Sequence, residues 1–354
     1  MKGIGPRLSR QLLAHCGSVD QIFAMSKKEL SLVPGIGKVG ADYIHSKSYL
    51  AEAEAELVFV EKNDISLVWF EDNAYPRRLK HCEDAPLVLY YKGAGSLNPK
   101  RVVSIVGTRN ATMYGKKIVE DLVQDLQALE VQVVSGLAYG IDIHAHRQCV
   151  KHEVSTVGVL GHGLDRIYPA AHREIALQML DKGGLITEFC SGTIPDRVNF
   201  PMRNRIIAGM ADVTVVVEAA IKGGALITAE IANSYNRDVC AFPGSLDQEY
   251  SAGCNYLIKT HRAQLIRGID DLSYLMGWDA ESSSVHSKQL SLLPPSLTKD
   301  EQRVYELLQE KEQVNIDDIA LHCAWPQSKL AIVLLEMEMK GVLLALPGKV
   351  FKLV

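Results

Sequence analysis

The sequence has no long hydrophobic run, no secretion signal and no cysteine pairs at metal-ligand spacing. Its longest apolar stretch, residues 205–220, is interrupted by Asp212 and Glu218, whereas a membrane-spanning helix needs about 20 apolar residues. The first residues also lack the apolar core of an export signal. We therefore expect no membrane span, no export and a cytoplasmic location.

The seven cysteines contain no Cys-x-x-Cys pair, which argues against a disulfide framework and against a cysteine-only zinc site. One cluster, Asp142-x-His144-x-His146, invites a metal interpretation. On a helix the two histidines would point about 200° apart, which is poor geometry for one ion. We therefore expect Asp142 to cap a helix, and we predict no metal and no cofactor.

Neither sign of charge dominates the chain, which contains 38 Lys and Arg and 42 Asp and Glu and has a formal net charge of −4. This balance excludes a uniformly basic coat, although a nucleic-acid footprint needs only positive charge gathered on one face. Such charge is concentrated in residues 100–117 and residues 193–209. An ordinary solvent-exposed surface would explain the positive charge of these two windows equally well.

The 354 residues are enough for two or three domains. We expect an all-α helix-hairpin-helix (SAM-like) domain at residues 1–60, an α/β domain at 61–279, a linker at 280–297 and a winged helix at 298–354. Within the α/β domain, apolar runs alternate with amphipathic stretches, which predicts an extended Rossmann-like parallel sheet with helices on both faces. Strands are predicted at residues 102–106, 131–136, 155–160, 185–188, 213–217 and 239–243, and a helix at 114–129.

The last segment begins with Thr298 followed three residues later by Glu301, which predicts a capping box and a helix to about Glu310. Two more helices, at residues 315–322 and 327–340, and a terminal hairpin at residues 342–353 complete the winged helix.

The run from Gly35 to Gly40 matches the dinucleotide fingerprint G-x-G-x-x-G, but no strand precedes it. We interpret it as a helix-hairpin-helix turn. Amides at the start of its second helix suit phosphate, with Gly35, Gly37 and Lys38 as possible contacts. A packing role explains the hairpin equally well.

Glycine follows several predicted strands, at Gly107-Thr108-Arg109, at Gly136 and at Gly161, and Gly223-Gly224 adds a fourth site. In an open α/β sheet, ligands bind at the carboxyl ends of the strands. Turn chemistry explains any one of these glycines, but together they indicate a phosphate-binding rim.

Residues 199–209 are the most informative run because they combine arginines, an amide and an aromatic ring. Arginine supplies planar donors for phosphate, and Phe200 can stack on a base. This combination suits a flexible single strand of nucleic acid. The candidate contacts are Arg197, Phe200, Arg203, Asn204 and Arg205.

These motifs, in this order, resemble the signatures of the DNA-processing protein DprA (Smf) family over nearly the whole chain. The runs that carry the resemblance are Ser104-Ile105-Val106-Gly107-Thr108-Arg109, residues 134–146, 159–169, 200–209, 217–219 and 224–229, and Phe242-Pro243-Gly244-Ser245. The resemblance implies the three-domain arrangement given above.

The resemblance also implies a function: binding incoming single-stranded DNA in natural transformation, shielding it and helping to load the RecA recombinase, as a homodimer. It places Arg109 at the DNA groove with Arg197, Arg203 and Arg205, and Phe200 as the stacking ring. The winged helix has many acidic residues, so we expect it to contact protein rather than duplex DNA. These residues are Glu301, Glu306, Glu310, Glu312, Asp317 and Asp318.

An alternative interpretation is a nucleotide-processing enzyme related to the lysine-decarboxylase-like phosphoribohydrolases. Residues 223–230 have glycines, a threonine and Glu230, but without the spacing of that family's loop. Considered separately, Glu218 and Glu230 are a candidate acid–base pair, although nothing in their spacing requires it. We expect no catalysis.

Overall fold

The computed structural model describes residues 4–46, 49–278, 297–311, 313–346 and 348–353. The predicted linker therefore lies almost entirely outside the described residues. Contacts divide the chain into two compact units, Met1–Leu265 and Ile266–Val354, and each is considered by itself. The domain boundaries drawn from the sequence remain predictions.

Short helices form the N-terminal part, as predicted. They are α1 (Pro6–Cys16), α2 (Val19–Ala24), α3 (Lys27–Leu32), α4 (Gly37–Ser46) and α5 (Leu50–Lys62). Ser26 and Glu29 form a capping box that starts α3, and buried Leu12, Leu30 and Ile44 belong to a small apolar core of these helices.

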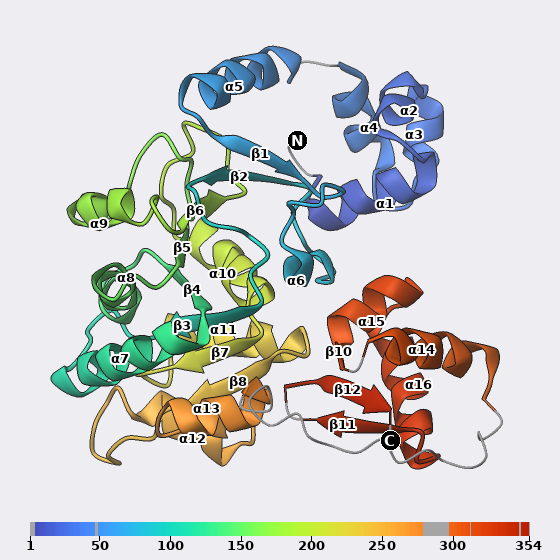
Figure 1. Ribbon diagram of the computed structural model, residues 1–354. Helices are drawn as coiled ribbons and strands as arrows, with labels where there is room; N and C mark the ends of the chain where they lie inside the picture. Colours follow the sequence, from blue (N-terminus) through green and yellow to red (C-terminus); the bar gives the residue numbers. More distant parts are fainter. Residues whose placement is uncertain (1–3, 47–48, 279–296, 312, 347, 354) are drawn as a thin grey trace. The chain divides into compact units, whose positions relative to one another are not determined.

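A nine-stranded sheet organises the first unit (Figure 1), in the order β1-β2-β6-β5-β4-β3-β7-β8-β9. From β6 to β9 all neighbours are parallel, whereas β1 and β2 add an antiparallel edge. The strands are β1 (Ser66–Trp69), β2 (Val88–Lys92), β3 (Arg101–Val106), β4 (Val131–Gly136), β5 (Thr156–Val159), β6 (Gly184–Thr187), β7 (Val213–Val216), β8 (Asp238–Ala241) and β9 (Gln264–Leu265).

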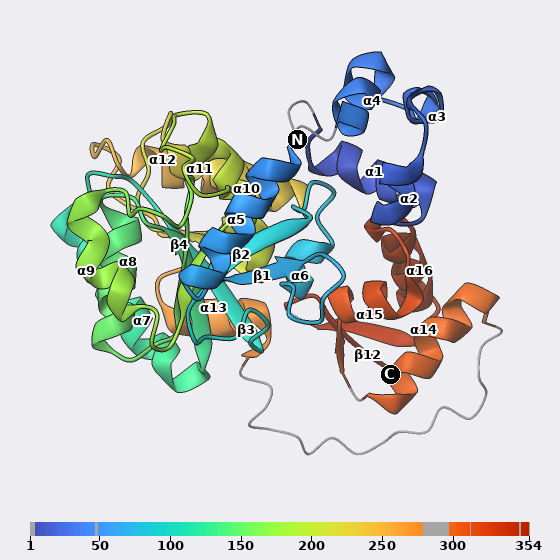
Figure 2. The same cartoon turned by 90° about the horizontal axis from the view of Figure 1, so that it is seen from above.

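Helices cover both faces of the sheet, with α7, α8 and α9 on one side and α10 and α11 on the other (Figures 1 and 2). The helices of this unit after α5 are α6 (Arg77–Lys80), α7 (Met113–Leu126), α8 (Ile141–Lys151), α9 (Arg173–Gln178), α10 (Asn199–Met210), α11 (Gly224–Ser234) and α12 (Ala252–Lys259). Two short 3-10 turns, Gln127–Leu129 and Ala170–His172, complete it.

All six strands predicted for the α/β domain are present, because parallel strands buried on both faces form continuous apolar runs. Three further strands, β1, β2 and β9, were not predicted. β1 and β2 have exposed or half-buried positions, and β9 has only two residues, both exposed. The predicted helix at 114–129 ends as an α-helix at Leu126 and finishes as a 3-10 turn.

A partly buried ion pair fixes the amino-terminal end of the parallel strands. Nε of Arg78 lies 2.6 Å from Oδ1 of Asp212, and the other carboxylate oxygen accepts the Val102 amide at 2.8 Å. Asp212 precedes β7, so this contact lies at the end opposite the glycine turns.

The second unit contains α13 (Ile269–Met276) and the winged helix, formed by α14 (Lys299–Glu310), α15 (Ile316–Cys323), α16 (Gln327–Met339) and the sheet β10-β12-β11. The strands are β10 (Val314–Asn315), β11 (Leu343–Leu346) and β12 (Val350–Leu353). The predicted capping box is confirmed: Thr298 accepts from the Glu301 amide and Glu301 from the Thr298 amide.

Two of the six acidic residues behind the expected protein contact are buried inside the winged helix and add no charge to its surface; the contact itself remains a prediction. The side chain of Glu301 is fully buried and accepts from Lys340 Nζ at 2.7 Å, and Asp317 is also buried. Glu306 and Glu310 are exposed, and Glu312 lies outside the described residues. Across the described ranges, no helix combines the length and apolar character that crossing a membrane would require.

Candidate functional site

The glycine-rich strand ends meet at one edge of the sheet and line a cavity of about 680 Å³, called here the basic groove. It is formed where β3 ends at Val106, by the turns before α8 and α11, and by the first turns of α10. Parallel strands bring their carboxyl ends to one edge, so segments more than 100 residues apart in the chain become neighbours there.

Nine of the eleven residues predicted to contact DNA line the basic groove. They are Gly107, Thr108, Arg109, Arg197, Phe200, Arg203, Asn204, Gly223 and Gly224. Gly136 and Arg205 are not among the lining residues.

Positive charge exceeds negative charge on the groove wall. Arg109, Arg197, Arg203 and Lys222 line it against two carboxylates, those of Asp142 and Glu249. Only part of the basic window at residues 100–117 contributes to this charge, because Arg101 lies at the amino end of β3 and bonds the Leu129 carbonyl. Only some of the basic residues in the two windows therefore line the groove.

Arg203 forms the floor of the groove and is nearly buried, with an exposed fraction of 5%. One of its terminal nitrogens donates to the carbonyl of Val159 at 2.5 Å, and its Nε has no hydrogen-bond partner. Burial lowers the pKa of its guanidinium, and the nearby Asp142 carboxylate opposes that shift. A buried donor facing a groove is suited to an anionic ligand.

Asp142 lies beside Arg203, and its own burial raises the pKa of its carboxyl to about 6, against the opposing effect of Arg203. Gly136 explains how the two fit together. A Cβ at position 136 would lie 2.1 Å from an Arg203 nitrogen and 2.5 Å from an Asp142 oxygen. Gly136 thus leaves room for the pair, and the structure gives it this packing role instead of a place on the groove wall.

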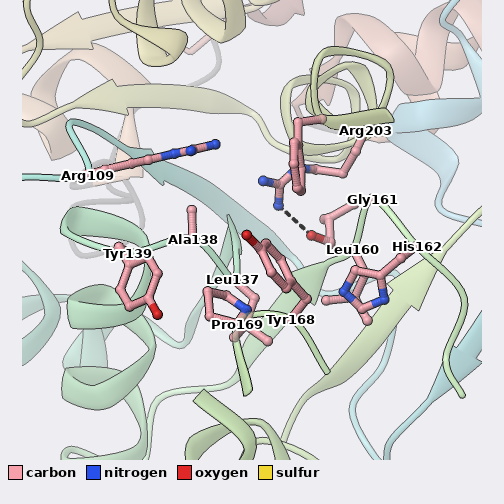
Figure 3. Close-up of a pocket in the computed structure, with 12 residues that line it drawn as sticks. Arg109, Leu137, Ala138, Tyr139, Leu160, Gly161, His162, Tyr168, Pro169 and Arg203 are labelled. Atoms are coloured by element: carbon pink, nitrogen blue, oxygen red, sulfur yellow. Dashed lines mark hydrogen bonds between the residues drawn. The ribbon is translucent and has the colours of Figure 1, made fainter. Parts of the chain in front are cut away.

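Phe200 stands between the basic groove and a smaller cavity of about 110 Å³, and it lines both. The Tyr168 ring is stacked on Phe200 with the centroids 6.2 Å apart, and Cζ of Arg109 lies 5.7 Å from the Phe200 centroid. Figure 3 shows the smaller cavity, with Arg109, Tyr139, Tyr168 and Arg203 around it. This wall offers stacking surfaces and cations together.

The assignment of Arg205 to the groove is wrong. Arg205 and Arg203 are two residues apart on α10 and therefore point in different directions. The side chain of Arg205 is buried, where it forms an ion pair with Glu188 and donates to the Asp84 carbonyl. It holds α10 against the loops beneath it.

The proposed capping role of Asp142 is also wrong, because Gly140 precedes the first helical residue and Asp142 lies inside the first turn of α8. The two histidines face different partners. His146 is fully buried between Thr156 and the Gly136 carbonyl, while His144 contacts the Lys116 carbonyl at 3.1 Å. Among the described residues no group of three or more His, Cys, Asp and Glu side chains could hold a metal ion.

The two glutamates considered as an acid–base pair have separate partners. Glu218 is buried and accepts from the amide and hydroxyl of Thr112, whereas Glu230 is exposed and forms an ion pair with Arg262. Neither lines the basic groove or the smaller cavity. Glu230, the glutamate considered for the nucleotide-processing alternative, therefore lies away from both cavities.

The predicted helix-hairpin-helix turn is present between α3 and α4. Gly35 and Gly37 have φ of +83° and +58°, a backbone conformation that favours glycine. Gly35, Gly37 and Lys38 are all exposed. Contact of these residues with DNA remains a prediction.

Sequence reasoning missed several lining residues, above all Lys222, Tyr139 and Tyr168. Lys222 directly precedes the Gly223-Gly224 pair, and that position was a usable signal. The two tyrosines lie in loops without any periodic pattern, so only the fold shows that both line the smaller cavity together with Phe200.

Comparison with family models assigns all three parts of the chain. Residues 66–277 match DNA recombination-mediator protein A, residues 289–349 the DprA winged helix domain, and residues 1–46 a SAM-like helix-hairpin-helix tandem.

Individual proteins give the same result. Protein Smf of Escherichia coli is 31% identical over 304 residues, covering 83% of this chain and 79% of its own length. The X-ray structure of DNA processing protein A from Streptococcus pneumoniae matches with a TM-score of 0.68 and 31% identity, over 76% of this chain and 93% of that one. The Helicobacter pylori protein, described by its single-stranded DNA binding mode, matches with a TM-score of 0.54 and 26% identity, over 63% of this chain and 97% of that one.

Proposed function

Because the chain belongs to the DNA recombination-mediator protein A (DprA, or Smf) family, we propose that it binds single-stranded DNA in the basic groove. The observation that supports this most directly is the convergence of Arg109, Arg203 and Phe200 on one cavity. Single-stranded DNA combines a line of phosphates with free base faces, and this wall offers partners for both. The single-stranded DNA binding described for the Helicobacter pylori relative agrees with the proposal.

In the proposed complex, phosphates contact Arg109, Arg197 and Lys222, while a base stacks on Phe200. The glycines at 107, 223 and 224 leave the backbone open to close approach, and Thr108 and Asn204 add neutral polar groups to the wall. Arg203 contributes positive charge from the floor of the groove. A duplex binds more weakly because its bases are already stacked on one another.

Fluorescence anisotropy with a labelled oligonucleotide, single-stranded and then duplexed, tests this proposal across a salt series. For single strands, the slope of log K against log salt is about −0.7 for each neutralised phosphate. Arg109→Ala is therefore expected to weaken binding and to make the slope shallower by about 0.7. Arg101→Ala is the matched control, an arginine at the opposite end of the same strand. Equal binding of duplex and single strand, unchanged in Arg109→Ala, would contradict the proposal.

We further propose that the bound strand is shielded and passed to the RecA recombinase, which places the protein in the cytoplasm. Family membership supports this step. The test is RecA filament formation on DNA already coated by single-strand binding protein, with and without this protein. Faster filament formation that Arg109→Ala abolishes is the expected result. No acceleration at any protein concentration would overturn the RecA step alone.

We also propose that the protein catalyses no reaction and that it acts as a homodimer. Incubation with nucleoside monophosphates should release no free base, and base release that Glu230→Gln abolished would restore the enzymatic alternative.

The oligomeric state has a separate test. Sedimentation velocity should give twice the mass of one chain. A single chain at micromolar concentration would contradict the dimer.

A further inference from the structure

The loop that presents Arg109 to the groove, residues 108–112, is fastened at both ends to Glu218. At its start, the Thr108 amide donates to the backbone carbonyl of Glu218 at 2.7 Å. At its end, the amide and hydroxyl of Thr112 donate to the two carboxylate oxygens at 2.9 and 2.5 Å. One residue thus closes the loop.

Glu218 is a buried acid that the proposed DNA contacts do not use. Its exposed fraction is 3%, and it lies two residues after the end of β7. Thr112 is the N-cap of α7, so the carboxylate sits at the helix end where the backbone dipole favours negative charge. Gly115 makes this possible, because a Cβ there would lie 2.1 Å from a Glu218 oxygen.

The loop has further supports besides Glu218. The Thr108 carbonyl accepts the Ile141 amide at 3.1 Å, and the Asn110 side chain donates to the Tyr250 hydroxyl at 2.9 Å. Gly140, with φ of +81°, lets the loop lie against α8, since a Cβ there would be 2.1 Å from the Thr108 carbonyl oxygen. The exposed side chain of Arg109 extends from this frame toward Phe200.

We propose that Glu218 is a positioning residue for DNA binding, which holds the 108–112 loop closed so that Arg109 is aimed into the basic groove. The inference rests on the proposed function. When a flexible arginine binds a phosphate, its side chain and its loop lose conformational entropy. A loop that is already held in place before binding loses less entropy, so binding is tighter. Glu218 itself touches no DNA.

The test is a double-mutant cycle between position 218 and Arg109, read out by single-stranded DNA affinity across salt. Glu218→Ala is expected to weaken binding about tenfold, the equivalent of about 1.4 kcal/mol, and to make the salt slope shallower as Arg109→Ala does. In the Arg109→Ala background, Glu218→Ala should add less than about twofold, because the group that it positions is gone. Additive effects would overturn the inference.

Two further variants separate positioning from general destabilisation. In Glu218→Gln the amide oxygen can accept from the Thr112 amide and the NH2 can donate to the Thr112 hydroxyl, so binding should stay within about threefold of wild type. Thr112→Val should weaken binding and flatten the salt slope as Glu218→Ala does, but to a smaller extent. It replaces Glu218→Ala in the test if that variant does not fold. Asp212→Asn is the matched control, a mostly buried, hydrogen-bonded carboxylate at the far end of the strands, and it should lower stability with no change in salt slope.

The outcomes distinguish this inference from the proposed function. If Arg109→Ala binds DNA as wild type does, the groove assignment fails and the positioning role fails with it. If Arg109→Ala weakens binding while folded Glu218→Ala and Thr112→Val do not, only the role of Glu218 is overturned.

Discussion

The guanidinium of Arg109 lies over the ring of Phe200, with Cζ 5.7 Å from the ring centroid. The two residues come from different segments, the turn after β3 and the first turn of α10. A cation held over an aromatic face is stabilised by the ring's quadrupole. The pair presents a phosphate donor and a stacking surface side by side, which are the two chemistries that single-stranded DNA requires.

Replacing Phe200 by leucine removes the stacking surface and leaves the cations in place. We expect single-stranded DNA affinity to fall by about 1–3 kcal/mol per stacked base, with the salt slope unchanged because no phosphate contact is lost. Anisotropy titrations at several salt concentrations measure both quantities. Phe70→Leu is the control, since that ring packs against Arg10 and Lys80 instead. A changed slope without a change in affinity would argue against stacking.

Arg205 should matter for stability and not for DNA. Arg205→Met leaves the buried Glu188 carboxylate without its cation, which costs about 3–5 kcal/mol of unfolding free energy. The double variant Arg205→Met with Glu188→Leu should recover most of this loss because no charge is then left buried. Urea denaturation measures stability, and anisotropy at low temperature measures DNA affinity. Affinity reduced as strongly as in Arg109→Ala would return Arg205 to the groove.

Acid should strengthen DNA binding through Asp142. Burial raises the pKa of this carboxyl to about 6, and Arg203 and Arg109 are the cations that oppose the shift. As the pH falls from 8 to 5 the carboxyl becomes neutral, so the groove loses one of its two negative charges and attracts phosphate more strongly. Anisotropy across this pH range should show tightening in wild type. Asp142→Asn should bind tightly throughout; the same pH dependence in that variant would exclude Asp142 as its source.

Asp142 and His146 should change stability with pH in opposite directions. The raised pKa of Asp142 means that its contribution to stability is lost as pH rises from about 4 to 6. Burial lowers the pKa of His146 to about 4, so its contribution is lost as pH falls from about 6.5 to 4.

The effect of His146 is best measured in the Asp142→Asn background, where the opposing contribution of Asp142 is absent. Lowering the pKa of the His146 ring to about 4 corresponds to roughly 3 kcal/mol of unfolding free energy. Urea denaturation at pH 7 and pH 4.5 should show a large part of this difference, and His146→Gln should reduce it. A pH-independent midpoint in the Asp142→Asn protein would contradict the buried neutral histidine.

The sequence by itself determined the central strands, the order of the domains and most of the groove. Strands such as β4 and β7 are buried on both faces, so they form apolar runs that need no tertiary knowledge to recognise. Gly107, which directly follows β3, and Gly223, which lies between β7 and α11, indicate the strand ends where parallel sheets bind ligands. The edge strand β1 lacked such a pattern because only part of it is buried.

Only the tertiary structure decided which polar residues face the groove. Arg203 and Arg205 are alike in sequence, yet the helix turns one toward the cavity and the other toward Glu188. Gly136 looked like a groove residue, but it makes room for Arg203 and Asp142. Side-chain direction depends on what packs against each helix face, and that packing comes from segments far away in the chain. The composition of the site was therefore readable from the sequence, while the role of each residue was not.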